Sequence, residues 1–276
     1  MITQLQCGRF RLSLQRPLIM GVVNVTPDSF SDGGRFFEPA AAIAHAQRLI
    51  DEGADLVDLG AESSRPGVAA VVSADEELRR LMPVLQSLRD APVPVSVDTV
   101  KPEVMRAALD AGASMINDIN AMRAPGALAA VEAAGAAVCL MHMQGTPGTM
   151  QQHPSYADVV AEVKDFLRER AGAARAAGIA AERIVIDPGF GFGKTLEHNL
   201  ELLRRLREFD ALGLPLLAGW SRKSSLGKIT GKPAADRLAS SIAAALIAAQ
   251  NGAKILRVHD VAATRDALAV LAAVER

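Results

Sequence analysis

Eight short apolar segments, each followed by a longer segment of helical character, constrain the fold of this 276-residue chain more than any other feature. Most are continuous hydrophobic runs rather than alternating ones, which is typical of parallel strands covered on both faces by helices. The predicted strands are residues 18–24, 55–59, 94–98, 114–118, 136–142, 183–187, 215–219 and 254–259. This alternation predicts βαβ units around a parallel sheet.

Eight strand–helix units make up a (β/α)8 or TIM barrel, and we predict a single such α/β domain over residues 1–276. The alternative is an open doubly wound sheet, which carries a glycine-rich turn after its first strand and an acidic residue ~20 residues later. The turn after the first predicted strand reads NVTPDSF and lacks those glycines. Residues 1–17 predict a short N-terminal β-hairpin that caps the barrel floor.

Three helical segments carry local signals. In residues 73–88, Ser73 and Glu76 predict a capping box at the helix start. The segment 195–209 opens on Thr195, and the alanine-rich segment 236–250 suits close helix contacts within the protein or across a dimer. The apolar residues expected on one face of the first segment are Leu78, Leu81, Met82, Leu85 and Leu88.

Composition excludes several classes of function. The net charge is −1 and basic residues are scattered, so we expect no binding to nucleic acid or to an anionic membrane. Two cysteines, Cys7 and Cys139, are too few for a disulfide framework in a chain of this length. No signal peptide is recognised, and no uncharged apolar run reaches the ~18 residues of a membrane span. We therefore expect a cytoplasmic protein.

Polar side chains lie at the end of each predicted strand or within three residues after it. In a barrel of this kind the carboxyl ends of the strands and the following loops form the reactive face. A ring of such groups therefore predicts a polar ligand site. Its members are Asn24, Glu62, Ser63, Ser64, Arg65, Asp98, Asn117, Asp118, His142, Asp187, Ser221, Arg222, Lys223, Arg257 and His259.

The residue types in the ring indicate two kinds of ligand. Asp98, Asn117, Asp187 and Lys223 suit a flat nitrogen heterocycle, because a carboxylate accepts the paired N–H donors of an amidine-like edge. Two aspartates and an asparagine also suit Mg²⁺. No close ligand spacing separates these interpretations, and both remain open from the residues alone.

A second group in the ring is cationic. Arg257 and His259 are two residues apart on a strand and therefore point to the same face. With Arg65, and with the amide oxygen of Asn24 opposite them, they suit a phosphate or pyrophosphate bound with Mg²⁺. The alternative is that RVH is only a surface strand end.

The segment DPGFGFGKT, residues 187–195, is similar to a nucleotide phosphate loop but does not match it. The motif G-x-x-x-x-G-K-[ST] requires a glycine where Pro188 stands. The aromatic residues Phe190 and Phe192 are expected either to stack on a ring-shaped ligand or to pack in the core.

Seven segments together resemble the dihydropteroate synthase family over nearly the whole chain: NVTPDSFSDGG (24–34), ESSRPG (62–67), SVDT (96–99), NDI (117–119), DPGFGFGK (187–194), WSRKS (220–224) and RVHD (257–260). The resemblance implies a transferase that joins 6-hydroxymethyl-7,8-dihydropterin diphosphate to 4-aminobenzoate, releasing pyrophosphate and giving 7,8-dihydropteroate for folate synthesis. It also implies Mg²⁺ as cofactor, inhibition by sulfonamides, and a homodimer formed through the last helices.

The resemblance also implies roles for individual residues. Asp98, Asp187, Lys223 and Arg257 would carry the catalysis. Because the barrier of this reaction lies in the departure of the diphosphate, we expect a largely dissociative substitution. The pterin would be held by Asp98, Asn117, Met141, Asp187, Phe190 and Lys223. The diphosphate would be bound by Asn24, Ser64, Arg65, Arg257 and His259, with Asn24 as the Mg²⁺ ligand. The 4-aminobenzoate would lie near Phe30, Ser63, Ser64, Pro66, Phe192, Lys223 and Ser224.

Two positions depart from the commonest family pattern: Ala61 replaces a glycine and Ser64 a threonine, without loss of a charged group. Three alternatives remain. A pterin-binding methyltransferase would give the SRK and RVH cations no role, and a sugar-phosphate barrel enzyme would need a glycine-rich phosphate site after its last strands. A non-catalytic pterin-binding paralogue would lack some of the ligands named above.

Overall fold

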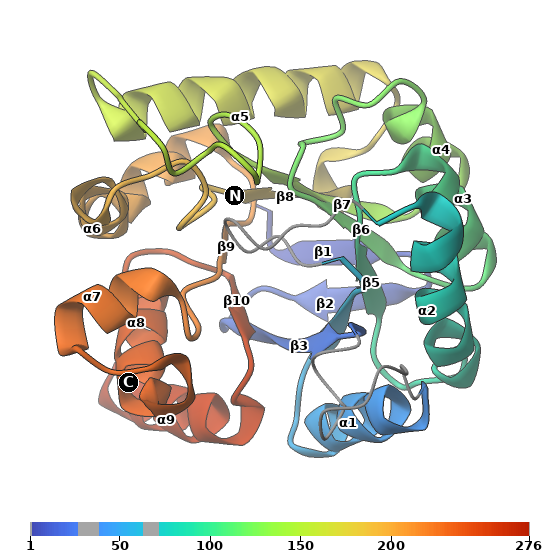
Figure 1. Ribbon diagram of the computed structural model, residues 1–276, viewed down its shortest axis with the longest axis horizontal. Helices are drawn as coiled ribbons and strands as arrows, with labels where there is room; N and C mark the ends of the chain where they lie inside the picture. The colour runs from blue at the N-terminus through green and yellow to red at the C-terminus, as the bar shows by residue number, and fades with distance from the viewer. Residues whose placement is uncertain (1, 27–38, 63–71, 276) are drawn as a thin grey trace.

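The computed structural model of the protein describes residues 2–26, 39–62 and 72–275. All eight predicted strands are confirmed, and all of their pairings are parallel. The strands are β3 (Leu18–Asn24), β4 (Leu56–Gly60), β5 (Val95–Asp98), β6 (Met115–Asp118), β7 (Ala137–Met141), β8 (Ile184–Asp187), β9 (Leu217–Ala218) and β10 (Ile255–Val258). They form the nearly closed barrel seen in Figure 1.

The order of strands around the sheet is β8-β7-β6-β5-β4-β3-β10-β9. A single parallel bridge between Ile186 and Leu216 joins the two edge strands, and the Ile186 amide donates to the Pro215 carbonyl at 3.0 Å. β9 is shorter than the predicted segment 215–219. Pro215 has no N–H for the sheet, which limits pairing at the start of this strand.

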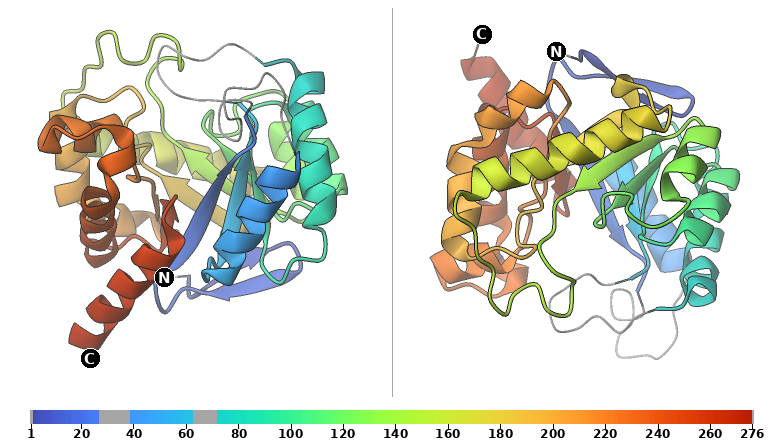
Figure 2. Two further views of the ribbon diagram at one scale, coloured as in Figure 1. Left: turned by 60° about the horizontal axis from the view of Figure 1, so that its bottom comes forward. Right: turned by 90° about the horizontal axis from the view of Figure 1, so that it is seen from above.

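The predicted hairpin is confirmed and lies at the barrel floor. β1 (Gln4–Cys7) and β2 (Phe10–Ser13) pair antiparallel. Leu5 and Cys7 are buried against residues inside the barrel near the beginnings of the strands, including Met115 and Ile255. Figure 2 shows the hairpin across one end of the barrel. Because this end is closed by apolar side chains, the opposite end is the one open to polar ligands.

Helices surround the strands (Figure 2) and bury the outward residues of the sheet, such as Ile19 and Leu59. The α-helices are α1 (Pro39–Asp51), α2 (Ala74–Ser87), α3 (Pro102–Asp110), α4 (Ala127–Ala133), α5 (Val159–Ala176), α6 (Leu196–Arg204), α7 (Ser224–Thr230), α8 (Leu238–Gln250) and α9 (Val261–Val274). Short 3₁₀ helices are η2 (Ala181–Arg183), η3 (Leu206–Leu212) and η4 (Ala234–Asp236). Within the described ranges, no helix is long and apolar enough to cross a membrane.

The helix starts partly follow the sequence signals. The Ser73 side chain accepts a hydrogen bond from the Glu76 amide at the start of α2, as predicted. The reciprocal half of that capping box is wrong, because the Glu76 carboxylate instead pairs with Arg79 and Arg80. Thr195 caps α6 as predicted, and the predicted segment continues beyond α6 as η3.

Candidate active site

The polar ring forms because side chains alternate between the two faces of each strand. Met115, Val185 and Ile255 face the interior of the barrel in the floor cluster. Residues two positions further along a strand point to the same side, toward the open end. These next positions are Asn117 on β6, Asp187 on β8 and Arg257 on β10; the same step from Leu56 on β4 reaches Asp58.

Arg257 is the centre of a partly buried hydrogen-bond network. Its Nε donates to Asp58 Oδ2 at 2.7 Å and its Nη2 donates to Asp98 Oδ2 at 3.2 Å. Asn117 Nδ2 donates to the same Asp58 oxygen at 3.1 Å. The structure therefore brings together Asp98, Asn117 and Arg257, which the sequence had placed in two different ligand groups.

Asp58 is the residue in this network that the sequence analysis missed. It is fully buried in the middle of β4, and in the sequence it was counted only as one position of the predicted strand DLVDL. A charged residue at an inward position of a buried strand requires a partner of opposite charge. That requirement was the one sequence signal that could have singled it out.

Lys223 and Asp187 form the other side of the ring. Lys223 Nζ donates to the Phe190 carbonyl and lies 4.8 Å from the centre of the Phe192 ring. The Gly189 amide donates to Asp187 Oδ1 at 2.7 Å, which fixes the carboxylate at the end of β8. Phe192 is thus beside a cation, as a cation–π contact requires.

Burial shifts the proton equilibria of these groups toward neutral pH. Burial raises the pKa of Asp98 to about 7, although Arg257 acts in the opposite direction. Burial lowers the pKa of Lys223 to about 8, opposed by Asp187. The pKa of Asp187 is also raised by burial, against the effect of Lys223. Perturbed groups gathered at one end of a barrel are typical of a catalytic site.

A second lysine of this region, Lys194, is buried, and burial lowers its pKa well below the usual value. It is only 2% exposed, and its Nζ donates to the carbonyls of Gly189 and Phe192 at 3.0 Å each. It also lies 2.9 Å from His142 Nδ1. Burial, together with Lys194, lowers the pKa of His142 to about 2, so the imidazole is neutral and accepts this hydrogen bond. Lys194 therefore fixes the chain that follows β8, a role the sequence analysis did not assign.

The remaining predicted site residues lie as follows. Met141 is buried in a cluster with Met143 and Met150, and Phe192 packs against this cluster. Phe190 is 1% exposed, with its ring centre 5.0 Å from that of Trp220, and packs between barrel and helices. Ser224 is exposed at the start of α7. Phe30, Ser63, Ser64, Arg65 and Pro66 lie outside the described residues.

His259 and Asn24 complete the described part of the anion group. Ser221 Oγ lies 2.9 Å from His259 Nδ1 and accepts from the His259 amide at 3.2 Å. Asn24 is half-buried at the end of β3, opposite Gly60 of β4, and its amide has no hydrogen-bond partner among residues 2–26, 39–62 and 72–275. An amide oxygen of this kind fits Mg²⁺, which takes few protein ligands and completes its shell with water and substrate phosphates.

Among the described residues, no group of three or more histidine, cysteine, aspartate or glutamate side chains is arranged to hold a metal ion. Asp98 and Asp58 instead share the charge of Arg257. The interpretation of the ring as a heterocycle site agrees better with this pairing than a metal cluster of its own carboxylates does.

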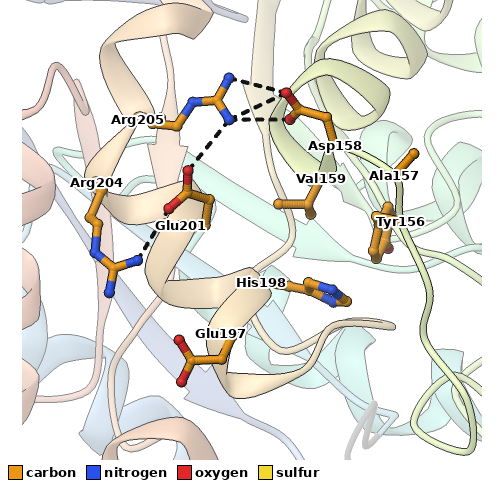
Figure 3. Close-up of a pocket in the computed structure, with 9 residues that line it drawn as sticks. All are labelled: Tyr156, Ala157, Asp158, Val159, Glu197, His198, Glu201, Arg204 and Arg205. Carbon is orange, nitrogen blue, oxygen red and sulfur yellow. Dashed lines mark hydrogen bonds and ion pairs between the residues drawn. The ribbon is translucent and has the colours of Figure 1, made fainter.

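A separate hollow of about 410 Å³ lies between the start of α5 and α6. Figure 3 shows ion pairs at this hollow: Arg205 contacts Asp158 at 3.3 Å and Glu201 at 3.4 Å. The Arg205–Asp158 pair joins the end of α6 to the start of α5, whereas the Arg205–Glu201 pair lies within one turn of α6. None of the ring residues of the barrel lines this hollow.

Comparisons with known proteins place this arrangement in a family. Residues 20–259 match the family model described as "Pterin binding enzyme". The chain is 51% identical over 263 residues to dihydropteroate synthase of Escherichia coli strain K12, covering 95% of this chain and 93% of that protein. It is 51% identical over 272 residues to the dihydropteroate synthase of Neisseria meningitidis serogroup B, covering 96% and 95%.

Solved structures agree with these relatives. Dihydropteroate synthase of Xanthomonas albilineans with 4-aminobenzoic acid has a TM-score of 0.93 and 55% identity, with 100% of this chain and 99% of that chain covered. The Yersinia pestis enzyme in a sulfonamide complex has a TM-score of 0.94 and 47% identity, with 99% of each chain covered. The chain therefore belongs to the pterin-binding enzyme family and, within it, to the dihydropteroate synthases.

Proposed function

We propose that this protein condenses 6-hydroxymethyl-7,8-dihydropterin diphosphate with 4-aminobenzoate to give 7,8-dihydropteroate and pyrophosphate. The observation that carries the proposal is the contact of Arg257 with Asp98, 3.2 Å between Nη2 and Oδ2, which joins an anion-binding cation to a heterocycle-binding carboxylate. The relatives support the substrates: one solved structure of the Xanthomonas albilineans enzyme is described as a complex with 7,8-dihydropteroate.

The pterin is held by hydrogen bonds in the ring of strand ends. Asp98 and Asp187 accept from the N–H donors of the pterin edge, and Asn117 supplies both a donor and an acceptor. Lys223 donates to a ring acceptor, while Met141 and Phe190 line the slot. The two buried carboxylates also favour positive charge that spreads into the pterin as the leaving group departs.

The diphosphate is the leaving group. Its C–O bond is largely broken first, and the amine nitrogen of 4-aminobenzoate then forms the new C–N bond and loses a proton. Arg65, Arg257, His259 and Ser64 stabilise the negative charge on the departing oxygens. Asn24 would hold Mg²⁺, which supplies further charge neutralisation on the diphosphate when bound. Because the nucleophile is the substrate amine, no serine or cysteine nucleophile is required, and we propose a largely dissociative substitution.

The amine substrate lies beside the leaving group. Phe192 stands next to the Lys223 ammonium, and Ser224 follows it at the start of α7. We propose that these residues, with Phe30, Ser63, Ser64 and Pro66, bind 4-aminobenzoate, and that sulfonamides compete for the same place.

The direct test incubates the purified protein with both substrates and Mg²⁺ and measures 7,8-dihydropteroate and pyrophosphate by chromatography. We expect the two products in equal amounts. Release of pyrophosphate without dihydropteroate, or no turnover at all, would contradict the proposal. A pterin-binding methyltransferase would instead consume a methylated pterin, a reaction in which Arg257 and His259 have no role.

We propose a homodimer formed through the last helices and a cytoplasmic location. The large exposed apolar side chains among the described residues all lie on α7, α8 and α9: Ile229, Leu238, Ile247, Val270 and Val274. Ala239, Ala243 and Ile247 form an exposed row along α8, and Figure 2 shows α9 extending away from the barrel. Sedimentation should give twice the 29.0 kDa monomer mass, and Ile247→Glu should shift it to the monomer. A wild-type monomer at micromolar concentration would contradict the dimer.

A further inference from the structure

Asp58 accepts hydrogen bonds from two side chains, Arg257 and Asn117, to which we assign different ligands. One oxygen, Oδ2, accepts from Arg257 Nε at 2.7 Å and from Asn117 Nδ2 at 3.1 Å. The other oxygen, Oδ1, is buried and has no hydrogen-bond partner among the described residues. Asp58 itself is 0% exposed. A single oxygen atom on β4 therefore contacts side chains that come from β6 and from β10.

The bond to Asn117 fixes the orientation of its amide. A carboxylate only accepts hydrogen bonds, so the Asn117 atom that faces Asp58 must be the nitrogen. The Asn117 oxygen is then left as an acceptor for another partner. Without Asp58, the amide could turn over and present a donor instead, which changes the ligand edge it recognises.

The bond to Arg257 fixes the orientation of the guanidinium. Nε is used by Asp58 and Nη2 by Asp98, while Nη1 makes no hydrogen bond with the residues described. A planar guanidinium held at two of its three nitrogens can turn little about its own axis. The third nitrogen therefore keeps a constant direction in which to donate to an anion.

We infer that Asp58 is a positioning residue that couples the pterin side of the site, through Asn117, to the diphosphate side, through Arg257. This inference rests on the proposed function, which assigns those two ligands to these two side chains. Asp58 touches neither ligand in this account. Its Oδ2 atom fixes the orientations of the Asn117 amide and the Arg257 guanidinium, which contact the ligands.

The test measures, by isothermal titration, the separate affinities for the two parts of the proposed substrate. These partial ligands are 6-hydroxymethylpterin and inorganic pyrophosphate with Mg²⁺. Asp58→Ala should weaken both by about 10- to 100-fold, the range for a hydrogen bond to a charged group. Asp58→Asn keeps an oxygen at the same place without the charge, and should recover part of both losses. This recovery by the conservative variant separates positioning from a general loss of packing.

Ser96→Ala is the matched control. Ser96 is the register partner of Asp58 on β5, is equally buried, and its hydroxyl has no hydrogen-bond partner among the described residues. The control should leave both affinities unchanged. If Ser96→Ala weakens both ligands as much as Asp58→Asn does, the effect belongs to the barrel interior in general and the inference is wrong.

A double-mutant cycle with Arg257→Gln tests the coupling itself. On that background Asp58→Asn should have no further effect on pyrophosphate, because its route to the anion has been removed, but should still weaken the pterin. The double variant Asp58→Asn, Arg257→Gln removes both charges of the Arg257–Asp58 ion pair and leaves neither of them buried without its partner. Its affinities can therefore be measured even if Asp58→Ala does not fold. Additive losses of pyrophosphate affinity in the cycle would overturn the inference.

The wild-type assay separates this inference from the proposed function. If the wild type forms no dihydropteroate, the proposed function has failed. If the wild type is active and the Asp58 variants bind both partial ligands normally, the function stands and the positioning role of Asp58 has failed.

Discussion

Arg257 and Asp98, 159 residues apart in the chain, meet at the carboxyl ends of β10 and β5 with 3.2 Å between Nη2 and Oδ2. The ion pair does not keep the Asp98 carboxyl group acidic. Burial raises its pKa to about 7, and the charges of Asp58, Asp118 and Glu77 add to this effect against Arg257. The protein at neutral pH is therefore a mixture of protonated and ionised Asp98.

The pH dependence of pterin binding follows from this pKa. Only the ionised carboxylate accepts two N–H donors, so affinity for 6-hydroxymethylpterin should rise as pH increases through 7. Below the pKa the change should approach about tenfold per pH unit, because binding must first remove a proton. Titration calorimetry from pH 5.5 to 7.5 measures it. Asp98→Asn should bind weakly with no such slope; an equal slope in the variant would assign the titration to another group.

Gly189 should tolerate no side chain. Its φ is +70°, and a Cβ there would lie inside the contact distance of the His142 carbonyl oxygen, which is backbone. Gly189→Ala should therefore lower the free energy of unfolding by more than about 3 kcal/mol, because backbone strain and a steric clash add. Urea denaturation measures the change.

Gly231→Ala is the control for that experiment. Gly231 has nearly the same φ, +72°, but a Cβ there meets no atom within 4 Å. Gly231→Ala should lower the free energy of unfolding by the backbone strain alone, about 1 kcal/mol. Equal losses at both positions would show that the His142 carbonyl contributes nothing.

Lys101 should be required for stability because of Glu77. The Glu77 side chain is fully buried, and Lys101 Nζ contacts it at 2.7 Å while also pairing with Glu62. Lys101→Met leaves a buried carboxylate unpaired and should lower the free energy of unfolding by about 3–5 kcal/mol. Thermal denaturation checks this, and Glu77→Gln in the same protein should recover most of the loss.

Arg79→Ala removes a different ion pair of α2, the exposed one with Glu76. It should leave the thermal midpoint unchanged, since exposed pairs are screened by solvent. A midpoint that falls as far as in Lys101→Met would show that burial does not distinguish the two pairs.

Much of the architecture was readable from local patterns. The apolar runs predicted all eight strands, because a parallel strand covered by helices needs hydrophobic side chains on both faces. Asn117 and Asp187 stood out because they end such runs. The reciprocal half of the α2 capping box was predicted wrongly because Arg79 and Arg80, one turn away, compete for the Glu76 carboxylate.

What the sequence did not supply were contacts between distant strands. Asp58 lies 199 residues from Arg257 in the chain. The two side chains meet only because closure of the barrel makes β4 and β10 face the same interior. Lys194 belonged to a rejected phosphate-loop motif, and its bonds to the chain after β8 depend on the path of that turn. Neither could be predicted from spacing, because the Asp58 contact depends on the register of the parallel strands and the Lys194 contacts depend on the conformation of the turn.

The measurement that tests the account most directly is calorimetric titration of 4-aminobenzoate into the protein with and without Mg²⁺ and pyrophosphate. If Arg257 anchors the leaving group beside the amine site, binding should appear only with both present and should vanish in Arg257→Ala. Arg205→Ala, a charge-matched change in the hollow of Figure 3, should bind as the wild type does. Binding of 4-aminobenzoate that is indifferent to pyrophosphate, or equal in Arg257→Ala and wild type, would contradict the account.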